Sequence, residues 1–208
     1  MTPPRKPAKG GGSDERPTKA NVDACRRCEL GEFATQGVVG EGPDGARLML
    51  VGEQPGNEED LAGRPFVGPA GQLLRALLEE AGIRAADTFI TNAVKHFYFT
   101  QRGKRRLHKT PLQRHVAACQ DWLEREIARV KPAVIVTLGA TALAAVSGTR
   151  VAIAAARNTD LRTASGLPIV ATYHPSAVLR VPDERGRKQM RTALLADLRR
   201  AKRAATRD

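Results

Sequence analysis

Short apolar runs alternate along the chain with segments whose apolar residues recur every three or four positions. The runs are typical of buried strands and cover Arg47–Gly52, Thr88–Val94, Ala133–Leu138 and Pro168–Thr172. Helical spacing covers Ala70–Ala81, Leu112–Val130 and an Ala-rich segment from Gly139 to Val146. Strands that alternate with helices indicate a parallel sheet covered on both faces. We therefore predict an α/β fold with four strands.

The two ends of the chain have a different character. Residues 1–20 are rich in Pro, Gly and Lys and carry too few apolar groups to fold, which predicts a disordered basic tail. Met190, Leu194 and Leu198 are spaced for one face of a final helix, so its arginines are expected on the solvent face more than on DNA. We expect a single domain over residues 21–204.

Three polar motifs follow the predicted strands. Gly52-Glu-Gln-Pro-Gly56 leaves the first strand, Asn92 lies in the second, and His174-Pro-Ser176 follows the fourth. In parallel α/β folds, ligands bind outside the carboxyl ends of the strands. The three motifs therefore predict one site at that edge of the sheet.

The composition narrows the function classes. The 208 residues carry 34 Lys and Arg against 22 Asp and Glu, a net charge of +12, and 41% of them are hydrophobic. This content is sufficient for a core, while no apolar run approaches the ~20 residues of a membrane span. The N-terminus has no apolar segment typical of a secretory signal, and three cysteines fit a reducing cytoplasm or a metal site. The positive charge favours a polyanionic partner such as nucleic acid.

The positive charge is concentrated in one internal segment. Lys95–His115 holds seven bases and no acid, whereas the chain without this segment and its two basic ends is mildly acidic. Residues 101–111 have the composition of a loop and include His108. A basic loop inside an acidic body is a candidate for contact with phosphates.

Four ordered motifs resemble those of the uracil-DNA glycosylase superfamily. They are Gly52-Glu-Gln-Pro-Gly56, the Gly-Arg-Pro-Phe-Val-Gly-Pro-Ala-Gly run of residues 63–71, Thr91-Asn-Ala-Val-Lys95 and His174-Pro-Ser176. The similarity is closest to the iron–sulfur (family 4) branch and to its UdgX relatives. It implies a three-layer α/β/α fold with a central four-stranded, mostly parallel sheet, and uracil-containing DNA as the substrate.

The resemblance assigns roles to individual residues. Phe66 matches the aromatic side chain that stacks on a flipped uracil, and Asn92 matches the amide that reads its Watson–Crick edge. His174 matches the histidine beside uracil O2, where it stabilises the departing base. Glu53 occupies the acidic position of the first motif. Gln54, placed in the uracil site, stands where family 4 has Ala and is similar to UdgX. Taken singly, Asn92 could equally be a turn residue and His174 a helix-start residue.

The same resemblance implies a metal centre. The matched ligands are Cys25, Cys28, His96 and Cys119, with His96 standing where family 4 has a third cysteine. Three thiolates and an imidazole suit an iron–sulfur cluster but are equally acceptable to zinc. The family favours [4Fe–4S] over zinc, in a structural role.

The basic segment departs from ordinary family 4 sequences. Residues 103–108, Gly-Lys-Arg-Arg-Leu-His, resemble a loop that distinguishes UdgX. In that group the loop histidine bonds to the deoxyribose, which implies that His108 is a nucleophile. Glu53 would then orient His108 or accept its proton. Lys104, Arg105 and Arg106 would hold backbone phosphates.

The sequence therefore predicts a monomeric, cytoplasmic uracil-DNA glycosylase that becomes covalently joined to DNA, preferably single-stranded, with no membrane partner. Two alternatives remain open. In one, the protein is an ordinary multiple-turnover glycosylase in which His108 only contacts phosphate. In the other, it is a noncatalytic iron–sulfur protein that binds nucleic acid. Glu53, Phe66, Asn92 and His174 argue against the latter.

Overall fold

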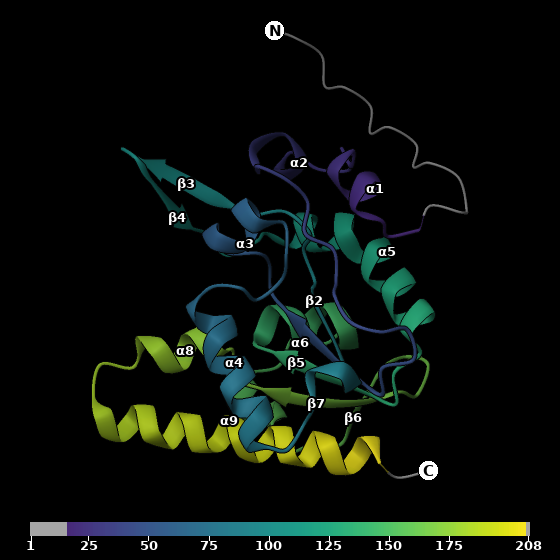
Figure 1. Cartoon of the computed structure of the whole chain (residues 1–208), viewed down its shortest axis with the longest axis vertical. Coiled ribbons are helices and arrows are strands. Elements are labelled where there is room, and N and C mark those ends of the chain that lie inside the picture. The colour runs from purple at the N-terminus through teal and green to yellow at the C-terminus, as the bar shows by residue number, and fades with distance from the viewer. Residues whose placement is uncertain (1–15, 207–208) are drawn as a thin grey trace, which may run out of the picture.

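A computed structural model describes residues 16–206 (Figure 1). Among these residues, five strands form the main sheet in the order β2-β1-β5-β7-β6. Their bounds are Leu48–Gly52 (β1), Thr88–Asn92 (β2), Val134–Leu138 (β5), Leu161–Arg162 (β6) and Pro168–Thr172 (β7). The four predicted strands are all present and mutually parallel, and the short β6 adds an antiparallel edge. Two residues are too few to give a detectable alternation, so the sequence did not indicate β6.

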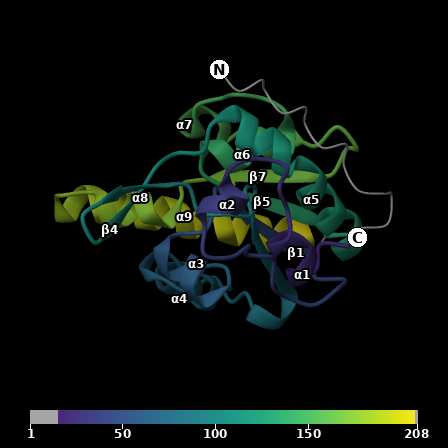
Figure 2. The same ribbon diagram turned by 90° about the horizontal axis from the view of Figure 1, so that it is seen from above.

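Helices cover both faces of the sheet, which confirms the three-layer arrangement (Figure 2). One face packs on α4 (Pro69–Glu80), α8 (Pro175–Arg180) and α9 (Glu184–Ala205). The other packs on α5 (Gln113–Val130) and α6 (Ala140–Ser147), with α7 (Ile153–Ala156) against β7. Every residue of β1 and β5 is buried, as expected for strands with both faces covered.

The helix boundaries follow local signals in the sequence. Pro69 occupies the first turn of α4, where its missing N–H costs nothing. Helix α5 ends at Lys131, which takes the left-handed conformation with φ of 51°, and Pro132 prevents continuation. Asp183 caps α9 by accepting a hydrogen bond from the Gly186 N–H. The predicted helices thus agree with the structure to within a residue or two.

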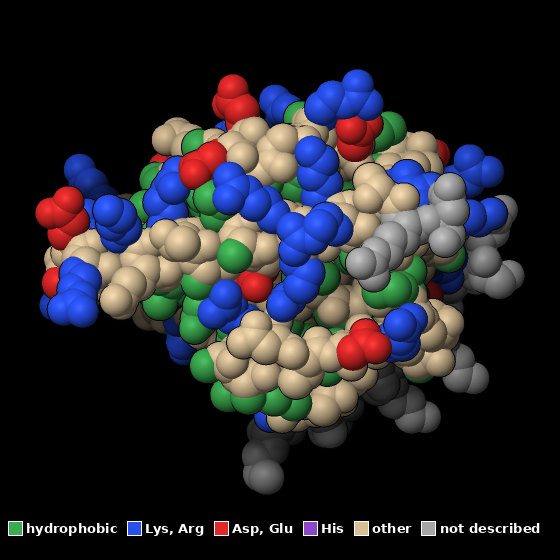
Figure 3. Space-filling model, turned by 90° about the horizontal axis from the view of Figure 1, so that it is seen from below, with side chains coloured by type: hydrophobic (Ala, Val, Ile, Leu, Met, Phe, Trp, Pro, Cys, Tyr) green, Lys and Arg blue, Asp and Glu red, His purple; other side chains and the backbone are tan. Residues whose placement is uncertain are grey.

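Helix α9 carries the basic C-terminal residues. Its apolar side, with Leu194 and Leu198, is buried against the sheet. Arg185, Lys188 and Arg203 are exposed. Figure 3, which views the molecule from below, shows Lys and Arg side chains spread over this face with acidic groups between them. Most of the arginines of α9 thus face solvent, as the spacing predicted, while Arg191 and Arg200 are partly buried.

The segment interpreted as a loop is instead a β-hairpin. Strands β3 (Phe99–Arg102) and β4 (Arg105–His108) pair antiparallel, with Phe99 opposite His108. Gly103 has φ of 58°, a conformation that suits the tight turn between them. The hairpin projects from the carboxyl edge of the main sheet (Figure 1).

The remaining helices are short. They are α1 (Lys19–Asp23), α2 (Leu30–Phe33), α3 (Asn57–Ala62) and the 3-10 turn η1 (Ala85–Asp87). Helix α1 begins inside the range expected for the basic tail, and residues 1–15 of that tail lie outside the described residues. Within residues 16–206, no helix combines the length and apolar character that crossing a membrane requires.

Candidate active site

A cavity of about 760 Å³ opens at the carboxyl edge of the sheet. Side chains from the end of β2 and from the segments that follow β1 and β7 line it, together with one from the hairpin and one from the α3–α4 loop. Among them are Glu53, Gln54, Phe66, Asn92, His108 and His174. The structure therefore brings the predicted catalytic and base-binding residues to one place.

Asn92 is the last residue of β2 and lies in register with Gly52 of β1. A Cβ atom at position 52 would lie 2.3 Å from Asn92 Oδ1 and 2.6 Å from Phe66 Cζ, so only glycine fits. Asn92 is 2% exposed, and its Oδ1 has no hydrogen-bond partner among the described residues. A buried acceptor without a donor is costly, and a ligand N–H would satisfy it.

Phe66 reaches the cavity from the loop between α3 and α4. Its backbone is left-handed, with φ of 54°, and its carbonyl accepts a hydrogen bond from Arg75. Gly71 allows this turn, because a Cβ there would lie 1.7 Å from the Phe66 oxygen. The Phe66 ring stacks against that of His174, with centroids 5.9 Å apart. The loop thus presents a flat aromatic surface beside the cavity.

His174 is the N-cap of α8. Its Nδ1 accepts a hydrogen bond of 3.1 Å from the Ser176 N–H, which leaves the proton of the neutral ring on Nε2. Burial lowers the pKa of His174 to about 4, against an opposing effect of Glu53. At neutral pH the ring is therefore an uncharged donor through Nε2.

This pKa predicts a pH dependence of stability. The histidine binds a proton in the unfolded chain below pH 6.5 but in the folded protein only near pH 4, so stability is lost as pH falls through this window. Between pH 7.5 and 4.5 the loss from this residue is about 2–3 kcal/mol. His174→Asn keeps a capping side chain and removes the titration. Urea denaturation at both pH values should show a smaller loss for the variant, and equal losses would contradict the assignment.

Glu53 connects the body of the site to the hairpin. One carboxylate oxygen accepts a hydrogen bond from Thr141 Oγ1, and the other lies 3.4 Å from His108 Nε2. Burial raises the pKa of the Glu53 carboxyl, but the contacts with His108 and Thr141 outweigh it and leave the pKa below its usual value. The carboxylate is therefore ionised and able to orient His108 or accept its proton.

Gln54 lies in the wall of the cavity, but its amide is engaged by the hairpin. Its Nε2 donates to the carbonyls of Tyr98 (3.2 Å) and Lys109 (3.0 Å), and its Oε1 accepts from the Tyr98 N–H. These partners flank the two strands of the hairpin. The Gln54 side chain, which was expected to bind uracil, thus holds together the two chain segments from which the β3–β4 hairpin extends.

The three basic residues of the hairpin differ in their surroundings. Lys104 and Arg105, at and beside the turn, are exposed, and the structure gives neither an ion pair within residues 16–206. Arg106 is held instead by side chains of α3 and by Thr35. Two of the three predicted phosphate contacts are therefore open to solvent, and the third is internally engaged.

The predicted metal ligands are only partly gathered. Cys28 and Cys119 pack in one small apolar cluster, and Cys25 Sγ accepts a hydrogen bond from Trp122 Nε1, one turn along α5 from Cys119. The backbone N–H of Lys95 faces Cys119. His96 is 3% exposed, and its Nε2 has no partner among the described residues.

The residue types of this donor set suit a metal group, but their side chains are not arranged around one position. Within residues 16–206, no three His, Cys, Asp or Glu side chains are arranged to hold an ion. Burial raises the pKa of the Cys119 thiol to about 12, so a thiolate there requires a compensating cation. The His96 ring nitrogen Nε2, which is buried without a partner, likewise requires one.

Other residues of the cavity were not indicated by the sequence. Thr141 holds Glu53 from the start of α6, and Arg180 of α8 lines the cavity while donating to Ser176 Oγ. A lone threonine in an Ala-rich helix has no local pattern that reveals its partner. Arg180 lies six residues beyond His174, and only this proximity could have suggested it.

Comparisons with known proteins extend over most of the chain. The sequence model of the uracil DNA glycosylase superfamily matches residues 39–199. The type-4 uracil-DNA glycosylase of Thermotoga maritima is 41% identical over 182 residues, which cover 87% of this chain and 89% of the relative. Those of Pyrobaculum aerophilum and Archaeoglobus fulgidus are 38% and 35% identical, over 83% and 79% of this chain and 88% and 82% of the relatives.

Proposed function

The chain belongs to the uracil-DNA glycosylase superfamily, and on this basis we propose that it is a uracil-DNA glycosylase whose His108 captures the DNA after the base is released. The glycosylase activity rests on the family and on the cavity residues. The capture rests on one observation, the position of His108 at this cavity with Nε2 3.4 Å from Glu53. The resemblance of residues 103–108 to the loop that distinguishes UdgX supports the same conclusion.

Base recognition follows from the groups in the cavity. Uracil must leave the DNA stack to reach them. The unpartnered Asn92 Oδ1 would accept the N3–H of the flipped base, and Phe66 would stack on its face. The neutral Nε2–H of His174 would donate to O2 as negative charge develops there. Such aligned donors supply the largest part of the rate enhancement in comparable reactions.

Capture would then proceed as follows. The bond between C1′ and uracil N1 breaks, and its electron pair leaves with the base, which gives an oxocarbenium-like sugar and a uracil anion. The electron pair of the unprotonated His108 ring nitrogen forms a new bond to C1′. The proton of the other ring nitrogen passes to Glu53 or solvent and finally to the uracil. DNA and protein are left joined through a carbon–nitrogen bond, with free uracil as the other product.

A denaturing gel tests this proposal directly. The full chain is mixed with a labelled single-stranded oligonucleotide that contains one uracil, and a second reaction uses the matched duplex. A band that is shifted and stable to heat and detergent, in at most 1:1 ratio to protein, is expected. Free abasic DNA in molar excess over protein would instead establish an ordinary turnover enzyme.

We also propose that Cys25, Cys28, His96 and Cys119 hold a [4Fe–4S] cluster. The orphaned His96 Nε2 and the packing of Cys28 with Cys119 in one cluster support a metal group here, and the family resemblance favours iron over zinc. When bound, the cluster would tie the N-terminal segment to α5 and leave the chemistry to the cavity residues.

The cluster predicts a measurable cofactor content. Protein purified without oxygen should be brown, absorb broadly near ~400 nm and contain about four iron and four sulfide per chain. Cys119→Ser should lose most of the iron, and its Tm should fall because α5 and the N-terminal segment lose a crosslink. Trp122→Phe removes the donor to Cys25 but no ligand, and it should retain the iron. Colourless protein with stoichiometric zinc would contradict the cluster.

A further inference from the structure

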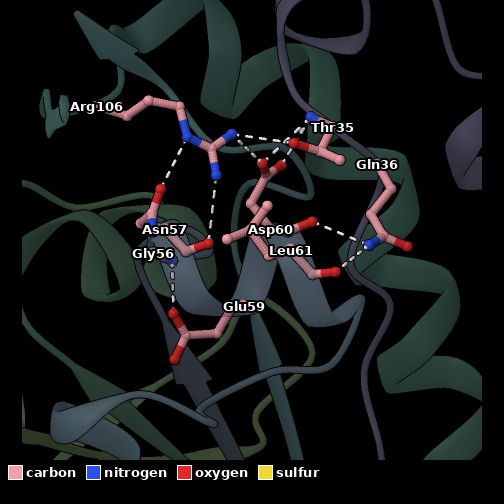
Figure 4. A network of polar contacts seen from close by, with 8 residues as sticks. All are labelled: Thr35, Gln36, Gly56, Asn57, Glu59, Asp60, Leu61 and Arg106. Atoms are coloured by element: carbon pink, nitrogen blue, oxygen red, sulfur yellow. Dashed lines mark hydrogen bonds and ion pairs between the residues drawn. The ribbon is translucent and has the colours of Figure 1, made fainter. Parts of the chain in front are cut away.

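A partly buried network, centred on the buried Asp60, joins β4 of the hairpin to α3. Arg106 Nη1 lies 2.6 Å from Asp60 Oδ2, and Arg106 Nε donates to Asn57 Oδ1 at 2.8 Å (Figure 4). Nη1 also donates to Thr35 Oγ1. The Asp60 side chain is fully buried, that of Arg106 is 16% exposed, and the guanidinium lies 5.1 Å from the Phe99 ring centroid. Because several hydrogen bonds hold the guanidinium, its orientation is fixed as well as the position of its charge.

The Asp60 carboxylate depends on this network. Its two oxygens accept hydrogen bonds from the Thr35 N–H at 3.1 and 3.2 Å, and Arg106 supplies the neighbouring positive charge. Losing one partner of a buried pair leaves an uncompensated charge, which is strongly unfavourable. Contact with α3 is therefore energetically favoured for Arg106, and its guanidinium is not free to contact a phosphate.

This arrangement acts on His108 through strand geometry. Arg106 and His108 are two residues apart on β4, so their side chains leave the same face of the strand. Fixing the direction of Arg106 thus fixes the face from which His108 emerges. Gln54 holds the base of the hairpin, and Arg106 holds its middle. The hairpin is attached to the body at two points on either side of the histidine.

We propose that the Arg106–Asp60 pair is a positioning element that holds His108 within reach of C1′ and so sets the partition between capture and release. The proposal rests on the proposed function, because capture by His108 is the step that it controls. Asp60 and Arg106 touch neither base nor sugar in this scheme. Their loss should leave cleavage of the glycosidic bond intact and let water reach the sugar before His108 does.

The test measures two quantities in one reaction. Total excision is the sum of free abasic DNA and adduct, and the captured fraction is the adduct divided by that sum. In Asp60→Asn and in Arg106→Gln, the captured fraction should fall about tenfold or more, because small displacements of a reacting group have effects of this size. Total excision by Asp60→Asn should stay within about twofold of wild type. The double variant should be no worse than either single variant, since both remove one interaction.

The two variants also separate positioning from phosphate binding. If Arg106 acted on DNA, Arg106→Gln would weaken binding and reduce its salt dependence, whereas Asp60→Asn would release the arginine and leave capture intact. Equal loss of capture in both variants supports positioning. Glu80→Gln is the matched control, because it breaks the α4–α9 pair with Arg191 far from the hairpin. It should change neither quantity.

The outcomes distinguish the two proposals. Wild-type protein that releases only free abasic DNA would overturn capture by His108. The positioning element is then tested by hydrogen exchange of the β4 amides, which should speed up in Asp60→Asn but not in Glu80→Gln. Unchanged exchange, or an unchanged captured fraction in a protein that does capture, would overturn the positioning role. If Asp60→Asn fails to fold, Arg106→Lys, which keeps the charge but loses the fork, should give an intermediate captured fraction.

Discussion

Replacing His108 with alanine is expected to abolish the covalent adduct and to convert the protein into a turnover enzyme. The side chain lies at the cavity mouth, half exposed, with Nε2 near Glu53. Its removal takes away the proposed nucleophile but leaves Asn92, Phe66 and His174, the residues proposed to hold the departing base. Water then captures the sugar, and free abasic DNA is released. Several equivalents of product per protein should accumulate where wild type stops at one.

The matched control for this experiment is Leu107→Ala. Leu107 is the neighbouring residue on β4, is 39% exposed and points to the opposite face of the strand. It tests whether any truncation in the hairpin prevents capture. The control should form the adduct at the wild-type level. An adduct that persists in His108→Ala would assign the nucleophile to another residue and contradict the mechanism.

Replacing Asn92 with alanine is expected to slow uracil excision by about 10²–10³-fold, the size of effect that follows removal of one aligned hydrogen-bonding group from an active site. The amide is 2% exposed, and its Oδ1 is the buried acceptor that uracil would satisfy. Capture should fall equally, because it follows excision. The measurement is the single-turnover rate of total excision. Unlike the Asp60 variants, Asn92→Ala should leave the captured fraction unchanged.

Gly52→Ala gives an independent version of the same test. The new Cβ would collide with Asn92 Oδ1 and with the Phe66 ring. Both base contacts would therefore be displaced, although neither Asn92 nor Phe66 is itself substituted. Excision should fall by a comparable factor. Asn158→Ala, an exposed asparagine outside the cavity lining, is the control and should retain the wild-type rate. A wild-type rate in Asn92→Ala would exclude base recognition by this amide.

The main sheet was predictable from the sequence because its strands are buried on both faces. β1 and β5 are continuous apolar runs between turn residues, which a one-dimensional pattern records. The hairpin was not predictable in the same way. β4 is mostly exposed, so charged residues stand where a buried strand would have apolar ones. Its pairing depends on the Gly103 turn and on contacts with distant segments.

The members of the site were predictable, but the roles of Gln54 and Arg106 were not. Motif order places side chains at strand ends, and Glu53, Asn92 and His174 meet there. Gln54 and Arg106 instead find their partners across 44 to 55 and 46 to 71 residues of chain, respectively. The composition of a basic segment suggests that its arginines contact phosphates, because composition does not show which carboxylates lie nearby in the fold. For Arg106, the nearby carboxylate is that of the buried Asp60.

The edges of the main sheet bear on how the protein behaves at high concentration. Exposed strand edges are templates for intermolecular pairing and aggregation. Here β6 covers one edge by pairing with β7, and at the other Glu41 exchanges both backbone hydrogen bonds with Ile90 of β2. These short segments limit the length of backbone open to a second copy. Edges shortened in this way leave little backbone on which the sheets of two copies could pair, which lowers the tendency of the protein to aggregate.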